Sequence, residues 1–256
     1  MELCTFSSQG SQKGKIGIAL VSNWFMPFHK SKSDRDAAGR GLDFMFMDPL
    51  AQGDYPFSMR VLVGDRLPKF TKKQSKMVKG SFDFIGLNYY TTYYAVAFPF
   101  TRNANMSVTY SGDIFANLTG EYKGKAIGPV AASSWLYVYP PGIRKLLLYT
   151  KKKYNNPVIY ITENGVDEIN NGSLSLAEAL RDDQRIAYYG QHLHQVQQAI
   201  REGADVRGFF AWSLMDNFEW AYGYTVRFGI YYVDYKDGLK RYPKSSAIWF
   251  RDFLKG

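Results

Sequence analysis

The feature that most limits the fold of this chain is an alternation of short apolar runs with amphipathic segments. Four runs are short enough to be buried strands, at residues 15–21, 82–88, 158–161 and 206–212. Segments with helical character occur at residues 35–50, 142–154, 176–202 and 242–254. Strands that are apolar almost throughout are typical of a parallel sheet with crossover helices. The sequence therefore predicts an α/β fold with four strand–helix repeats.

The composition fits a globular protein and excludes several other classes. Apolar residues make up 46% and charged residues 21% of the 256 residues, which excludes a disordered chain. The single cysteine, Cys4, excludes an internal disulfide framework and a cysteine-based zinc site. No apolar run is long enough to span a membrane, and the first residues do not resemble a secretory signal. We expect no membrane partner, and the sequence gives no localisation.

The chain is basic, with a net charge of +9, and its basic residues cluster at residues 66–79 and 144–153. One interpretation is a surface for nucleic acid. The alternative is the solvated face of helices, which is the more common origin of such clusters. We favour the alternative and expect no nucleic-acid partner.

Polar residues follow the ends of the predicted strands. Glu163 comes directly after the apolar run 158–161, where desolvation would oppose its charge unless a partner stabilises it. A carboxylate in that position is either used chemically or caps the following turn. Asn88 and Tyr90 end the second strand in the same way. Because loops at the carboxyl ends of strands build the sites of α/β folds, we expect these residues to lie together.

A second cluster follows the fourth strand. Trp212 and Trp220 bracket Asp216 and Glu219 within one short loop. Flat aromatic rings beside carboxylates suit a sugar, which has an apolar face and a rim of hydroxyl groups. The alternative is a loop folded over its own aromatic core. We expect the connections at about residues 89–139 and 213–241, after the second and fourth strands, to be long and irregular.

These motifs, taken in order, resemble glycoside hydrolase family one, the β-glucosidases, and most closely its plant members. The matching stretches are FIGLNYY at 84–90, SWLY at 134–137, ITENG at 161–165, WSLMDNFEW at 212–220 and RFGI at 227–230. The resemblance implies a (β/α)₈ barrel of which only the last four βα units are present. It runs from about residue 13 to the C-terminus, so residues 1–12 are expected to be a non-homologous lead-in and residues 13–256 the C-terminal half-barrel.

The resemblance also implies a retaining β-glucosidase site that needs no metal or organic cofactor. Glu163 corresponds to the nucleophile and Tyr90 to the tyrosine that hydrogen-bonds it. The other residues correspond to substrate contacts: Asn88 in the sugar subsite, Trp135 on the aglycone wall, Trp212 under the sugar ring, Glu219 and Trp220 on its hydroxyls, and Phe228 as a further pocket aromatic. The implied substrate is a β-D-glucoside.

The family's general acid/base motif, Thr-x-Asn-Glu-Pro, does not occur in this sequence. Asp167 and Glu168 are expected to face solvent and not to replace it. Four parallel strands cannot close a barrel, so the implied partners are the missing N-terminal half-barrel or a second copy. We expect the isolated chain to have negligible β-glucosidase activity. The alternative is a non-catalytic carbohydrate-binding or assembly module.

Overall fold

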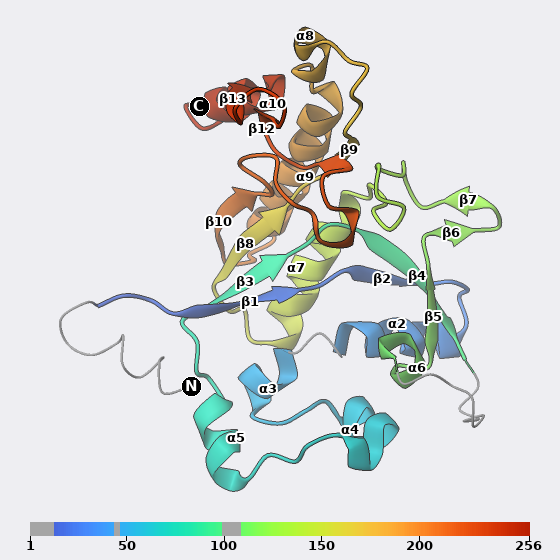
Figure 1. Cartoon of the computed structure of the whole chain (residues 1–256). Helices are drawn as coiled ribbons and strands as arrows, with labels where there is room; N and C mark the ends of the chain where they lie inside the picture. Colours follow the sequence, from blue (N-terminus) through green and yellow to red (C-terminus); the bar gives the residue numbers. More distant parts are fainter. Residues whose placement is uncertain (1–12, 44–46, 99–108) are drawn as a thin grey trace.

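The computed structural model describes residues 13–43, 47–98 and 109–256 (Figure 1). Residues 1–12, the predicted lead-in, lie outside the described residues. The centre is a four-stranded sheet in the order β1 (Gly17–Val21), β3 (Phe84–Asn88), β8 (Ile159–Asn164) and β10 (Val206–Ala211). All three pairings are parallel. The four predicted strands are confirmed, and their order in the sheet follows their order in the sequence.

The strand register brings the polar strand ends to one edge of the sheet. Val21 of β1 pairs with Asn88 of β3, and Asn88 pairs with Glu163 of β8. Ala211 of β10 pairs with Asn164, the residue after Glu163. Because all four strands run in the same direction, the segments that follow them begin side by side.

Helices cover one face of the sheet. α7 (Pro141–Lys153) and α9 (Asp183–Arg201) pack on it, and α10 (Ser245–Phe253) packs beside α9 (Figure 1). Ile159 and Ile161 of β8 are fully buried in this layer. Burying one such side chain contributes roughly 1.5–3 kcal/mol, so this face supplies much of the stability of the sheet.

The helices expected at residues 142–154 and 242–254 are present as α7 and α10, although α10 begins only at Ser245. The single helix expected over residues 176–202 is wrong, because it is divided into α8 (Leu176–Ala179) and α9. Asp182 lies between them in a non-helical conformation and accepts hydrogen bonds from Ser246 of α10 and from Arg185. Contacts with α10 therefore override the helical pattern at this point.

The segment expected to be one helix ending at Asp48-Pro49 also differs. It contains α2 (Lys32–Asp43) and α3 (Met47–Gln52). Pro49 is the third residue of α3, in the first turn, where a backbone amide has no partner within the helix. The proline therefore fits the start of a helix and does not end one here.

The two stretches expected to be irregular contain short secondary structure. In the first, β4 (Thr92–Ala97) lies between β2 (Trp24–Pro27) and β5 (Ala116–Thr119), so that the β1–β3 pairing resumes as β2–β4 after a short break. The other elements of these stretches and their surroundings are α4 (Phe57–Val63), η1 (Gly64–Arg66), α5 (Lys72–Val78), α6 (Tyr110–Asp113), β6 (Glu121–Tyr122), β7 (Lys125–Ala126), β9 (Glu168–Ile169), η2 (Trp220–Tyr222), β11 (Val226–Arg227), β12 (Tyr231–Asp234) and β13 (Lys240–Pro243).

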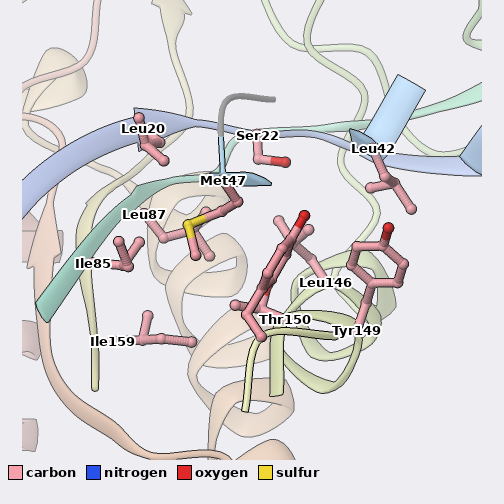
Figure 2. A pocket seen from close by; sticks show the side chains of 11 residues that line it. Leu20, Ser22, Leu42, Met47, Ile85, Leu87, Leu146, Tyr149, Thr150 and Ile159 are labelled. Atoms are coloured by element: carbon pink, nitrogen blue, oxygen red, sulfur yellow. The ribbon is translucent and has the colours of Figure 1, made fainter. Parts of the chain in front are cut away.

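A small apolar cavity lies between the helix-covered face of the sheet and α7 (Figure 2). Leu20, Ile85 and Ile159 line it from the sheet, and Leu146 and Tyr149 line it from α7. Its volume of about 30 Å³ has room for a water molecule or two. It lies among core side chains and is too small for a sugar. Among the described helices, none combines the length and apolar character of a membrane span.

Candidate active site

Glu163 lies at the carboxyl end of β8, in the middle of the sheet, and its side chain is half-buried. The hydroxyl of Tyr90 donates a hydrogen bond to Glu163 Oε2 at 2.6 Å. The backbone amide of Tyr89 donates to the carbonyl oxygen of Glu163 at 3.0 Å. The carboxylate is therefore held from the end of the neighbouring strand β3, and no contact that caps the following turn is seen among its described hydrogen bonds.

Tyr90 is the residue around which this site is organised. Its ring contacts Trp135 and Phe228 edge-on, with centroid distances of 5.8 and 6.1 Å. Burial, and then the neighbouring Glu163 carboxylate, raise the pKa of Tyr90 well above its ordinary value. The phenol therefore stays protonated at physiological pH and remains a donor to the carboxylate.

The loop after β10 places a second carboxylate at the same end of the sheet. The indole Nε1 of Trp212 donates to Glu219 Oε1 at 3.2 Å, and Glu219 is buried. Burial raises the pKa of Glu219, and the nearby carboxylates of Asp167 and Glu163 add to the rise. The arrangement provides two carboxylates and an indole within one polar and aromatic site.

A close backbone approach joins the ends of β8 and β10. The amide of Trp212 donates to the carbonyl oxygen of Asn164 at 2.9 Å. A Cβ atom at Gly165 would lie 1.9 Å from the carbonyl oxygen of Trp212, so only glycine fits there. The Glu-Asn-Gly sequence thus brings the Glu163 and Trp212 segments together.

The remaining predicted residues differ in exposure. Asn88 accepts a hydrogen bond from Thr162 Oγ1 at 2.6 Å and so lies beside the Glu163 strand. Trp135 is partly exposed, and its carbonyl oxygen accepts a hydrogen bond from Tyr93. Trp220 is 84% exposed, while Phe228 is buried. The structure thus brings six of the other seven predicted residues into contact with the Glu163 segment or its immediate neighbours, and leaves Trp220 at the surface beside Glu219.

Asp216, expected beside Glu219 as a sugar contact, has a different role. Its carboxylate is completely buried and pairs with Arg227 and, at 3.4 Å, with Lys244. It also accepts hydrogen bonds from the backbone amides of Gly229 and Val233. A carboxylate with these four partners holds the loop together and does not face a substrate.

The expectation that Asp167 and Glu168 face solvent is wrong. Asp167 is fully buried and accepts hydrogen bonds from the amide and hydroxyl of Ser133, at 2.9 and 2.5 Å. Glu168 is half-buried and pairs with Lys244 and Arg185. Because Ser133 is two residues before Trp135, Asp167 ties the Trp135 segment to the chain that follows Glu163.

Sequence reasoning missed Tyr188 of α9, a fully buried tyrosine below the site. Its hydroxyl donates to the carbonyl oxygen of Tyr90 and accepts a hydrogen bond from Asn164. Tyr188 thereby links Tyr90 to Asn164, the residue that follows Glu163. In the sequence, Tyr188 falls among the apolar positions of a helix, a pattern that indicates core packing and not a place in a site.

The basic clusters are partly neutralised. Arg66, Arg144 and Lys153 form ion pairs with Asp113, Glu202 and Asp43. This agrees with the interpretation of these clusters as ordinary helix surface. Within residues 13–43, 47–98 and 109–256, no group of three or more His, Cys, Asp or Glu side chains is arranged to hold a metal ion.

Comparison with known families decides the classification. The family model described as glycosyl hydrolase family 1 matches residues 2–256. The chain belongs to glycosyl hydrolase family 1. The resemblance seen in the sequence motifs is confirmed, and with it the assignment to a family of glycosidases.

Curated relatives of the chain are plant β-glucosidases. It is 65% identical over 249 residues to β-glucosidase 12 of Oryza sativa subsp. indica, a match that covers 96% of this chain and 48% of the relative. It is 50% identical over 253 residues to raucaffricine-O-β-D-glucosidase of Rauvolfia serpentina, covering 97% of this chain and 47% of the relative. The chain thus spans about half the length of the curated relatives it matches.

Solved family members share the fold. A rice Os3BGlu6 β-glucosidase mutant, solved in a covalent complex with Glc, superposes with a TM-score of 0.94 at 44% identity, covering 98% of this chain and 53% of that chain. A β-glucosidase of the fungus Humicola insolens, solved with glucose, gives a TM-score of 0.90 at 37% identity, covering 98% and 54%. The predicted fold class is confirmed: the described residues form part of a family 1 (β/α)₈ barrel and do not close it.

Proposed function

We propose that this chain carries the nucleophile side of a retaining β-glucosidase site. In this reaction the Glu163 carboxylate attacks the anomeric carbon of a β-glucoside, and the bond from that carbon to the aglycone oxygen breaks. The aglycone leaves with a proton from a general acid, and water later hydrolyses the glucosyl ester. The observation that carries the proposal is the half-buried Glu163 carboxylate at the strand end, held by the Tyr90 hydroxyl at 2.6 Å.

The proposal assigns the surrounding residues to substrate contacts. Tyr90 orients the nucleophile, and Asn88 and Trp212 contact the sugar. Glu219 and Trp220 bind its hydroxyl groups, and Trp135 and Phe228 form the aromatic wall toward the aglycone. Aromatic faces next to hydrogen-bonding carboxylates match the two kinds of surface that a pyranose presents.

Two features of the relatives support this assignment. The curated proteins are named as β-glucosidases over a match that includes all of these residues. The rice enzyme was solved in covalent complex with Glc, which is the kind of species that a retaining nucleophile forms.

The proposal requires a general acid from outside the residues that surround Glu163. Glu219 is the nearest candidate, and burial raises its pKa, but its carboxylate is engaged by the Trp212 indole. Asp167 is engaged by Ser133. General acid catalysis contributes on the order of 10²–10⁴-fold, so residues 13–256, taken as one half-barrel, are expected to have negligible turnover alone. The missing contribution would come from an N-terminal half-barrel or from a second copy.

Dinitrophenyl β-glucoside tests the proposal, because its leaving group needs no protonation. The chain is mixed with this substrate, phenolate release is followed, and Glu163→Gln serves as the matched control. We expect release that stops at or below one equivalent per chain and is absent from Glu163→Gln. Equal release from both proteins would contradict the nucleophile assignment. Sustained turnover that depends on Glu163 would contradict the need for an external acid/base residue, because that residue acts as the base when water hydrolyses the glucosyl ester.

The absence of the acid motif from the sequence favours a second candidate function, a non-catalytic carbohydrate-binding module. Calorimetry with glucose separates the two. Glucose binding that is weakened by Trp212→Ala, combined with no phenolate release, would favour the binding module.

A further inference from the structure

Trp135 lies at the tip of a tight turn. The amide of Leu136 donates to the carbonyl oxygen of Ser133 at 3.0 Å, which closes a four-residue turn. The amide of Ala131 donates to the carbonyl oxygen of Leu136 at 2.9 Å, so the chain pairs with itself next to the turn. Leu136 is fully buried in the apolar core. We call residues 133–136 the Trp135 turn, a small unit whose place in the site depends on the groups that hold it.

Two other segments of the chain hold the Trp135 turn. Asp167, four residues after Glu163, accepts hydrogen bonds from the amide and the hydroxyl of Ser133 at 2.9 and 2.5 Å. The hydroxyl of Tyr93, on β4, donates to the carbonyl oxygen of Trp135 at 2.5 Å. Of these two attachments, the one through Asp167 joins the turn to the segment that carries the proposed nucleophile.

The carboxyl group of Asp167 is unfavourable for folding where it lies. It is fully buried, and burial raises its pKa. Its Oδ1 atom has no hydrogen-bond partner among the described residues, and a buried acceptor without a partner destabilises the folded state. Departures of this kind are expected at functional sites more than in contacts that serve packing alone. The burial of this carboxyl group therefore indicates a role in the neighbouring site.

Tyr90 connects the same two segments from the other side. Its hydroxyl donates to Glu163 and its ring contacts Trp135 at a centroid distance of 5.8 Å. These contacts and the chain itself form a closed ring that joins the nucleophile, the tyrosine, the turn and the buried carboxyl group. We propose that Asp167 is a positioning residue, which fixes the distance between Trp135 and Glu163 and so governs which aglycones the site accepts. This inference rests on the proposed function for the roles of those two residues.

The charge of Asp167 provides an alternative route to the site. The Asp167 carboxylate raises the pKa of Glu219, a proposed sugar contact, so its removal affects Glu219 even if the turn does not move. Asp167→Asn removes the charge but keeps an oxygen acceptor for Ser133, whereas Asp167→Ala removes both. A positioning role therefore predicts a defect in the alanine variant that the asparagine variant does not share.

Two glucosides that resist hydrolysis test the proposal. Phenyl 1-thio-β-D-glucoside and methyl 1-thio-β-D-glucoside share the sugar and differ in the aglycone. Calorimetry on the full chain gives the dissociation constant of each, and their ratio measures the preference for an aromatic aglycone. We expect Asp167→Ala to lower this preference by about three- to tenfold and Asp167→Asn to keep it within about twofold. Because both probes make the same sugar contacts, the ratio cancels an effect transmitted through Glu219.

A matched pair of serine variants keeps the test independent of whether Asp167→Ala folds. Ser133→Ala removes the hydroxyl donor but keeps the amide hydrogen bond to Asp167, so the preference should fall by about two- to threefold. Ser134→Ala makes the same chemical change one residue later, where the hydroxyl lies 3.4 Å from that of Tyr222, and should leave the preference unchanged. In a Trp135→Ala background, loss of the Asp167 or Ser133 contact should lower the preference no further.

The outcomes separate this inference from the proposed function. An unchanged preference in Asp167→Ala with native circular dichroism, equal losses in the two Asp167 variants, or equal losses in the two serine variants would each overturn the inference. A further loss in the Trp135→Ala background would overturn it as well. A wild-type chain that binds neither probe would overturn it together with the proposed sugar site. The expected shifts in a chain without Glu163-dependent phenolate release would support the positioning role and contradict the proposed nucleophile.

Discussion

The two segments that carry the carboxylates of the site are supported by different kinds of interaction. After β10, Glu219 lies three residues from Asp216, whose buried charge is balanced by Arg227 and Lys244. After β8, Glu163 lies four residues from Asp167, whose hydrogen bonds both come from the neutral Ser133. Asp216 therefore belongs to a buried ion cluster, whereas Asp167 is held by neutral hydrogen bonds. The same chemical change, aspartate to asparagine, should have very different effects in the two places.

The largest effect is expected at the ion cluster. Asp216→Asn leaves Arg227 buried without its counter-charge and leaves Lys244 paired with Glu168 alone, and breaking a buried pair in this way costs about 3–5 kcal/mol. Denaturant unfolding measures the loss. Asp252→Asn, which breaks only exposed pairs with Arg251 and Lys255, is the control and should change the free energy of unfolding very little. Similar losses for both variants would remove the distinction between the two segments.

The next effect concerns how Glu163 is held. Tyr90→Phe removes the hydroxyl that donates to its carboxylate, and a hydrogen bond to a charged group contributes about 1.5–3 kcal/mol. We expect the Glu163-dependent release of phenolate to slow by about 10–100-fold. The control is Tyr93→Phe, whose hydroxyl donates to the carbonyl of Trp135 and not to a carboxylate. An unchanged rate for Tyr90→Phe would show that the contact does not orient the nucleophile.

A smaller, pH-dependent effect is expected at Asp167. Burial raises the pKa of its carboxyl, so the folded state binds the proton more tightly than the unfolded state. The resulting stabilisation is present below the unfolded pKa and is lost as pH rises through the raised folded pKa. Asp167→Asn removes this titration while keeping an oxygen acceptor for Ser133. The free energy of unfolding of the variant should therefore increase relative to that of the wild type as the pH rises. A constant difference between pH 3 and pH 8 would contradict the assignment.

The smallest effect is expected at Trp220. Its side chain is 84% exposed, so Trp220→Ala should change the free energy of unfolding by no more than about 0.5 kcal/mol. The same substitution should weaken binding of glucose if this tryptophan contacts sugar hydroxyls, and calorimetry measures that change. A large loss of stability would mean that Trp220 packs in the loop and does not serve the substrate.

The sequence predicted the central sheet well because each strand contains a short run of mostly apolar residues. It also placed Glu163, Tyr90, Trp212 and Glu219 at one end, because parallel strands bring their carboxyl ends together. The helix pattern failed at Asp182, where tertiary hydrogen bonds to another helix override local periodicity. No local pattern distinguishes such a residue from its neighbours.

The buried acids were beyond sequence reasoning for a related reason. Asp167 and Asp216 were expected at the surface or against substrate, but both lie inside. Their partners Ser133 and Lys244 are between 28 and 34 residues away in sequence. A charged residue near a site motif shows only that the segment is polar. Whether that residue contacts substrate or forms an internal ion pair depends on which distant groups the fold brings close to it.

The most direct test of the account is to find where a glucosyl group becomes covalently attached. The chain is treated with a dinitrophenyl fluoroglucoside, which forms a slowly hydrolysed ester with a carboxylate nucleophile. Peptide mass spectrometry then locates the adduct. The account predicts one adduct per chain, on Glu163, and none in Glu163→Gln. An adduct on Glu219 or on any other residue, or labelling that persists in Glu163→Gln, would contradict it.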